Sequence, residues 1–180
     1  MSTRAMVKIF REDLTQTGIY IHWDGYIEYT GVILQAFYNT PEKVEKLIAL
    51  GDLSSIDERT EPSGEHSYNK PEQGVCVAYH RDRGEEFTQT NCEQEYNYYY
   101  YEKTGVWYVD NYATGFSNVF NMEYDTRTTT PLIDEIMQRS LEHCGLWFPE
   151  NPNRKFKDID ELKNTCLKRA MEARTNTSYI

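Results

Sequence analysis

The sequence predicts an α+β domain in which helices pack on a largely antiparallel β-sheet. Three observations support this class: a strand pair at the start, two helical stretches directly after it, and a tyrosine-rich hairpin beyond residue 95. A chain of 180 residues can bury a single core without disulfide or metal support. We therefore expect residues 1–180 to form one domain with the order strand, strand, helix, helix, further strands and two C-terminal helices.

The chain begins with a predicted β-hairpin that leads into a helix. Residues 4–10 and 18–23 alternate in the strand period on either side of a polar segment. The Asp-Gly pair at 24–25 then favours a turn. Apolar residues on one helical stripe predict a helix over 28–38.

The second helix has the clearest boundary signals. Thr40 is a suitable N-cap, Pro41 suits the first helical position, and Gly51 can end the helix. Residues 54–74 are rich in Asp, Glu, Ser, Pro and Gly, which predicts a long surface loop. The short apolar run at 75–79 predicts a strand that ends in a charged sequence.

The second half of the chain predicts one hairpin and two helices. Residues 96–101 and 106–112 flank a glycine-containing turn, which predicts an antiparallel hairpin. Pro131 opens a predicted helix. Residues 146–157 form a predicted connection to a last, peripheral helix that Asp158 can cap.

Composition narrows the classes of partner. The formal charge of -10 and the pI near 4.9 argue against direct nucleic-acid binding, which needs clustered Lys and Arg. The four cysteines show no zinc-like spacing, so we expect no metal, and no spacing predicts a cofactor. No stretch approaches the ~20 apolar residues that span a bilayer. We expect a cytoplasmic protein that makes no membrane contact and has reduced thiols.

Several segments carry a resemblance to a known family. The sequences MSTRA at 1–5, GIYIHWDGY at 18–26, YNTPEKV with LIALGDLSS within 38–55, and YHRDRGE at 79–85 resemble a family of proteins of bacteriophages and prophages. The resemblance covers the first half of the chain closely and the tyrosine-rich hairpin loosely. It implies a phage setting in the host bacterial cytoplasm and no particular chemistry. By association with other small acidic phage proteins, it suggests an inhibitor of a host protein or defence system, of the anti-CRISPR type.

Two polar groups are candidate parts of a ligand site. His22 and Asp24 lie two residues apart, so a regular strand would place both side chains on one face; the alternative is a turn in which Asp24 accepts backbone N–H bonds. Arg81 and Arg83 can bind an anion through planar guanidinium groups, or pair with the acids beside them. If these segments converge, His22 and Tyr26 join the arginines in a site for an anionic nucleotide signal.

The tyrosine-rich hairpin is the candidate protein-binding surface. Its aromatic residues must occupy both faces of a strand, because successive side chains alternate. One face can pack on helices while the other contacts a host protein or a second copy of the chain; the alternative is a strand covered on both faces. The surface residues that we predict are Tyr98, Tyr99, Tyr100, Tyr101 and Trp107.

Catalysis has one candidate residue. Removal of Met1 would expose Ser2, and an N-terminal amine beside a hydroxyl at the head of a strand is the arrangement of N-terminal-nucleophile hydrolases. No other element of that mechanism is recognisable in the sequence. We therefore expect a protein that acts by binding, with the hydrolase as an alternative.

Overall fold

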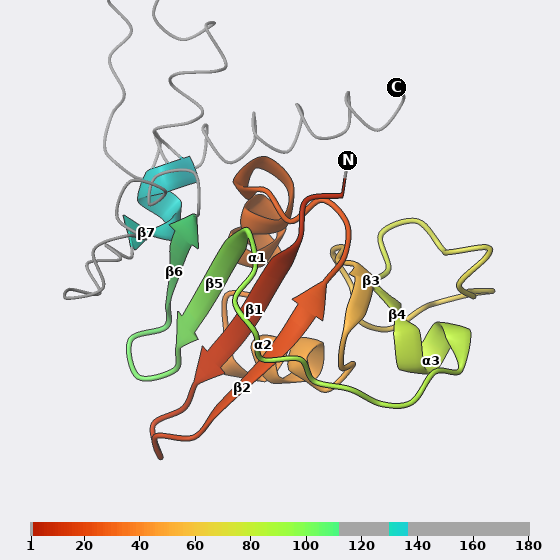
Figure 1. The fold of residues 1–180 in the computed structure, drawn as a ribbon, viewed down its shortest axis with the longest axis horizontal. Coiled ribbons are helices and arrows are strands. Elements are labelled where there is room, and N and C mark those ends of the chain that lie inside the picture. Colours follow the sequence, from red (N-terminus) through yellow and green to blue (C-terminus); the bar gives the residue numbers. More distant parts are fainter. Residues whose placement is uncertain (1, 112–129, 137–180) are drawn as a thin grey trace, which may run out of the picture.

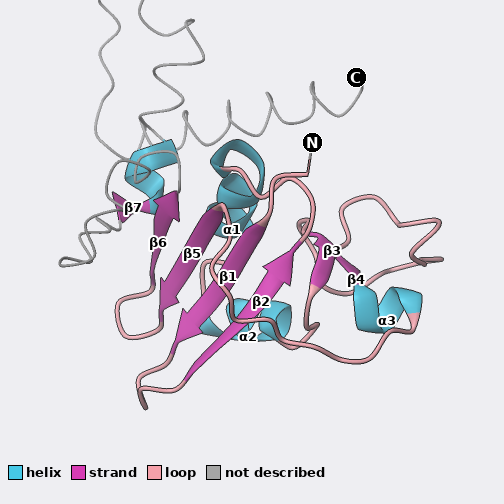
Figure 2. Cartoon of the chain, viewed as in Figure 1, coloured by secondary structure: helices cyan, strands magenta, loops and turns pink. Residues whose placement is uncertain are grey.

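The computed structural model describes residues 2–111 and 130–136. This part of the chain is an α+β structure with one mixed β-sheet and short helices (Figures 1 and 2). The strands lie in the order β4-β3-β2-β1-β5-β6-β7. The predicted α+β class is confirmed, while the predicted helix after 146–157 lies outside the described residues.

The sheet and helices alternate along the chain as follows. The elements are β1 Ala5–Phe10, β2 Gln16–Ile21, the π-helical turn η1 Ile27–Gly31, α1 Val32–Phe37, α2 Pro41–Ile48, β3 Leu53–Ser55, β4 Val77–Ala78, α3 Tyr79–Arg83, β5 Tyr96–Tyr101, β6 Val106–Asn111 and β7 Thr130–Pro131. Residues 132–136 are helical directly after β7. Both predicted hairpins and the first two predicted helices are therefore present.

The sheet combines antiparallel and parallel pairs. The β1–β2, β3–β4, β5–β6 and β6–β7 pairs are antiparallel, whereas β1–β5 and β2–β3 are parallel. The parallel β2–β3 pair arises because η1, α1 and α2 form a crossover between these strands. Within the described residues, the sheet is therefore mixed, with antiparallel pairs in the majority as the sequence predicted and two parallel pairs that it did not predict.

Two segments differ from the predicted elements. Strand β3 extends into the predicted loop 54–74, because Leu53 continues the pairing of β2 although two serines follow it. The charged sequence after the 75–79 strand forms the short helix α3, and Gly84 ends it with a φ of 74°. A left-handed residue of this kind is a common helix end.

Helix α2 shows why its boundaries were predictable. The Thr40 hydroxyl accepts a hydrogen bond from the Lys43 N–H at 3.4 Å, and Pro41 occupies the first turn. Gly51 follows the helix with a φ of 73°, a conformation that glycine adopts without steric cost. Val44, Leu47 and Ile48 form its buried face against the sheet.

The core lies between the helices and one face of the sheet, which we call the inner face. Tyr98 and Tyr100 of β5 are fully buried there, and Trp107 of β6 pairs with Tyr100. The Tyr98 hydroxyl donates to the Gly25 carbonyl at 2.8 Å, and Trp107 Nε1 donates to the Tyr38 carbonyl at 2.7 Å. These bonds tie the tyrosine-rich hairpin to the helical layer.

The opposite, outer face is crossed by residues 84–95, which we call the crossing segment. Figure 1 shows this part of the chain, between α3 and β5, passing in front of β2 and β1. Its anchor is the buried Asp52 carboxylate, whose Oδ1 accepts from Thr90 N at 2.8 Å and from Tyr20 N at 2.9 Å. Within the described residues, no helix has the length and apolar character needed to span a bilayer.

Candidate functional site

Four rings gather on the outer face of the sheet, and we call them the outer aromatic face: Phe10, Tyr99, Tyr101 and Tyr108. Phe10 and Tyr101 stack with ring centroids 4.9 Å apart and planes 8° apart. Tyr108 meets Tyr101 edge-on at 5.3 Å, and Tyr99 lies 6.0 Å from Phe10. Tyr101 retains 37% of its surface exposed to solvent.

Strand register brings these rings together. β1 and β5 run parallel with Phe10 opposite Tyr101, while β5 and β6 run antiparallel with Tyr99 opposite Tyr108. Side chains alternate along each strand, so all four rings point away from the helices. Tyr99 and Tyr101 were predicted for this surface. Phe10 and Tyr108 were not predicted for this surface. The signal that could have identified them is alternation, because each lies next to a buried residue in its own strand and therefore faces the other side of the sheet.

The same alternation corrects the rest of the predicted aromatic surface. Tyr98 and Tyr100 are fully buried, and Trp107 is 2% exposed. Because they occupy the inner face, these three residues stabilise the core and are not available to a partner.

Lys8 lies between the outer aromatic face and the crossing segment. Its Nζ is 5.7 Å from the Phe10 ring centroid. Burial lowers the pKa of Lys8, and the nearby Glu93 carboxylate partly opposes that shift. The lysine stem thus adds apolar surface beside the rings.

Two carboxylate side chains border the stacked pair. Glu102 directly follows Tyr101, and its N–H donates to the Phe10 carbonyl at 2.9 Å. The Glu102 Oε2 atom accepts from the Glu12 N–H at 2.8 Å, so both acidic residues stand at the same end of β1 and β5. Glu12 is exposed and Glu102 is half-buried.

The predicted His22–Asp24 pair does not form. His22 Nδ1 is hydrogen-bonded to the Tyr20 hydroxyl at 2.9 Å, and Trp23 packs edge-on against the imidazole at 4.7 Å. Asp24 has a φ of 57°, which takes it out of the strand conformation, and its carbonyl accepts from the Thr30 hydroxyl. Burial raises the pKa of Asp24. The alternative of a local turn at Asp24 therefore describes the structure better than an acid–base dyad.

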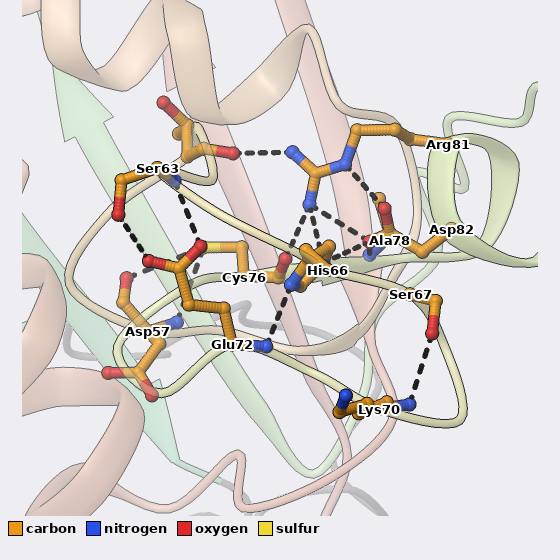
Figure 3. Close-up of polar contacts among 11 residues, drawn as sticks. Asp57, Ser63, His66, Ser67, Lys70, Glu72, Cys76, Ala78, Arg81 and Asp82 are labelled. Carbon is orange, nitrogen blue, oxygen red and sulfur yellow. Dashed lines mark hydrogen bonds and ion pairs between the residues drawn. The ribbon is translucent and has the colours of Figure 1, made fainter.

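Arg81 is a structural residue. Its guanidinium donates to the Asp82 carboxylate, to the Thr60 carbonyl and, at 2.6 Å, to the Cys76 carbonyl (Figure 3). The hydrogen bond with Asp82 raises the pKa of Arg81 although burial opposes it. The guanidinium thus joins α3 to the loop that precedes β4, while the predicted role of Arg81 in a ligand site stays a prediction.

His66 and Asp82 form the buried centre of this loop. His66 Nε2 lies 3.0 Å from Asp82 Oδ2, and their side chains are 2% and 3% exposed. His66 Nδ1 accepts from the Glu72 N–H at 3.0 Å, so Nε2 carries the proton that is donated to Asp82. Both ring nitrogens are therefore engaged, as Figure 3 shows.

Glu72 links two distant parts of the same loop through its carboxylate. Its carboxylate accepts from Ser63 N at 2.9 Å, Gly64 N at 3.0 Å and Arg59 Nη2 at 2.8 Å. Hydrogen bonds from the Ser63 hydroxyl, from Arg59 and from backbone amides lower the pKa of Glu72 to about 2. The predicted long loop is therefore held together by its own polar side chains.

Arg83 faces solvent, unlike Arg81. Its guanidinium lies 4.8 Å from the Tyr68 ring centroid, and Nη1 pairs with Glu85 at 3.1 Å. Tyr26 lies before η1 and packs against Tyr29 at 6.2 Å. The partners described above for these four residues all come from outside the predicted set, so a common ligand site of His22, Tyr26 and the two arginines stays a prediction.

Two expectations remain, the candidate catalytic residue Ser2 and the absence of a metal site. Ser2 is half-buried ahead of β1, and its hydroxyl makes no hydrogen bond to a described residue. No cluster of three His, Cys, Asp or Glu residues suited to a metal ion occurs among residues 2–111 and 130–136.

Comparison of the chain with protein-family models, with curated proteins and with solved structures gave no match. The phage setting therefore stays a prediction, and the geometry of the outer face carries the functional argument.

Proposed function

We propose that this chain is a phage-encoded accessory protein that acts by binding and inhibiting a host protein, with the outer aromatic face as its contact surface. The observation that carries the proposal is the Phe10–Tyr101 stack on the face that α1 and α2 do not cover. Rings fixed by their neighbours lose little conformational freedom on binding, which is why tyrosine is enriched at interfaces.

Charge favours a protein partner over a nucleic acid. Glu12, Glu93 and Glu102 surround the rings, and the chain carries a formal charge of -10. Stacking on bases needs cations that track the phosphates. An acidic border instead favours a partner with basic groups at the rim of its interface.

A second candidate is a binder of an anionic nucleotide signal at Arg83. Arg83 stacks on Tyr68, and its ion pair with Glu85 is exposed, so an incoming phosphate can replace Glu85 at low energetic cost. This candidate uses a guanidinium and one ring, whereas the outer aromatic face offers four rings in mutual contact.

Affinity capture from host-cell lysate separates the two candidates. The tagged chain, the double variant Tyr101→Ser with Tyr108→Ser, and the control Trp23→Ser are compared by mass spectrometry of bound proteins and released small molecules. Trp23 is 44% exposed and follows the end of β2 that pairs with Ala5, at the other end of β1 from Phe10, so its variant removes a similar ring elsewhere.

The proposal requires a stoichiometric host protein that the double variant loses and the Trp23→Ser variant keeps. Capture that survives the double variant would refute the contact surface. A bound anionic metabolite that disappears with Arg83→Ala, in the absence of a captured protein, would favour the second candidate. Far-ultraviolet circular dichroism of each variant checks that the fold is retained.

A further inference from the structure

One corner of the outer aromatic face combines rings with carboxylates, and we call it the acidic corner: Phe10, Glu12, Tyr101 and Glu102. Its parts are joined by the Phe10–Tyr101 stack at 4.9 Å, the Glu102 N–H bond to the Phe10 carbonyl at 2.9 Å, and the Glu12 N–H bond to Glu102 Oε2 at 2.8 Å. We infer that the acidic corner binds an arginine side chain of the partner protein, an inference that rests on the proposed function.

The rings can accept the flat face of a guanidinium. Tyr101 keeps 37% of its surface exposed although it stacks on Phe10. A guanidinium over an aromatic ring is attracted by the ring quadrupole. The Phe10 ring already lies 5.7 Å from the Lys8 ammonium, so the exposed surface of Tyr101 is the better position for a cation from the partner.

The carboxylates can hold the edge of the same guanidinium. The bond from Glu12 N–H orients the Glu102 carboxylate, and Oε1 of Glu102 makes no hydrogen bond to another residue in the described part of the chain. Glu12 is exposed and stands beside it. Arginine presents N–H donors in the plane of its guanidinium, so it can stack on a ring and donate to a carboxylate at once.

Neighbouring cations leave the corner acidic. The Arg11 guanidinium is hydrogen-bonded to the Glu45 carboxylate, and its weaker through-space interaction with the Glu102 carboxylate leaves Glu12 and Glu102 able to hold a second cation. Lys8 stands beside Glu93, and Lys103 is exposed in the hairpin turn. A phosphate or another anion would meet the carboxylates of Glu12 and Glu102, whereas a lysine ammonium would satisfy them without covering the ring.

Blocked synthetic peptides test the inference directly. An N-acetylated peptide with three arginines separated by glycines is titrated into the full chain at about 50 mM salt, where surface charges are weakly screened. Matched peptides carry lysine or citrulline in place of arginine. Binding is followed by calorimetry and by chemical-shift changes at Tyr101 and Glu102.

We expect the arginine peptide to bind about fivefold tighter than the lysine peptide and to shift the acidic corner. Glu102→Gln should remove most of that preference, while Glu58→Gln, which removes the same charge from an exposed loop position, should keep it. Equal binding of the arginine and lysine peptides, or equal losses in the two variants, would overturn the inference.

The lysate experiment separates this inference from the proposed function. A host protein that is lost with Tyr101→Ser and Tyr108→Ser, but retained by Glu12→Gln with Glu102→Gln, would refute the arginine site and leave the binding function standing. Selective binding of the arginine peptide, with no host protein captured from the lysate, would support the arginine site and count against the proposed inhibition of a host protein.

Discussion

Asp52 anchors the crossing segment to the sheet, and its substitution measures how much that anchor contributes to stability. Oδ1 accepts from the Tyr20 and Thr90 N–H groups at 2.9 and 2.8 Å. Oδ2 accepts from the Thr88 hydroxyl at 2.9 Å and from the Thr90 hydroxyl. The side chain is buried beneath the segment that it holds, so water cannot easily replace these bonds.

The two substitutions Asp52→Asn and Asp52→Ala should differ in magnitude. Asparagine keeps one oxygen for the two backbone amides, and the threonine hydroxyls can rotate to accept from its NH₂ group, so we expect a loss of about 1–3 kcal/mol in the free energy of unfolding. Alanine leaves the partly buried N–H groups of Tyr20 and Thr90 without this acceptor. At about 1–3 kcal/mol for each, the loss should reach roughly 2–6 kcal/mol.

Urea unfolding followed by tryptophan fluorescence measures these losses, and hydrogen exchange at the Tyr20 and Thr90 amides locates them. Asp13→Asn is the matched control, because Asp13 accepts from the Thr15 N–H at 2.9 Å and the Thr15 hydroxyl at 2.6 Å in an exposed turn. We expect that control to change stability by about 0.5 kcal/mol or less. Equal losses for Asp13→Asn and Asp52→Asn would refute the argument that burial gives the Asp52 bonds their value.

Three further predictions concern the core, a thiol and the loop before β4. Tyr98→Phe removes the buried bond to a backbone carbonyl and should cost about 1–3 kcal/mol in urea unfolding, whereas Tyr101→Phe should cost less than about 0.5 kcal/mol. Burial raises the pKa of Cys76 to about 11, so peptide mapping after brief maleimide treatment at pH 8 should find Cys92 labelled and Cys76 unlabelled; equal labelling would contradict the buried position. Because the folded pKa of Glu72 is about 2, below its ordinary 4.5, its stabilising effect is full above pH 4.5 and is lost as the pH falls towards 2. The difference in melting temperature between the native chain and Glu72→Gln should therefore shrink over that range, and a constant difference would argue against the ionised carboxylate as the cause.

Local signals predicted the elements whose determinants are near neighbours in the chain. Thr40, Pro41 and Gly51 bound α2 because a cap, a fixed φ and a left-handed residue act within one turn. Strand β3 was missed because Ser54 and Ser55 lack an apolar pattern, and its pairing depends on Leu53 lying beside β2. Backbone pairing between distant segments overrides weak local preference.

The candidate site was predictable in part for the same reason. Tyr99 and Tyr101 were named from the sequence, while their contacts with Phe10 and Tyr108 depend on strand order and register. The two arginines were treated as one pair, yet Arg81 is enclosed by carbonyls of the loop and Arg83 faces solvent. The helical geometry of α3 separates their directions, and the sequence predicted a strand end there.

The sequence alone therefore determined the α+β class, the two hairpins, the capped helix and the acidic character of the chain. Only the tertiary structure decided that β1 lies parallel to β5, that the crossing segment passes over the outer face, and which tyrosines are buried. The physical reason is the sequence separation of the determinants. Periodicity and capping depend on residues within a few positions of one another, whereas strand register and burial depend on how distant segments pack into a common core.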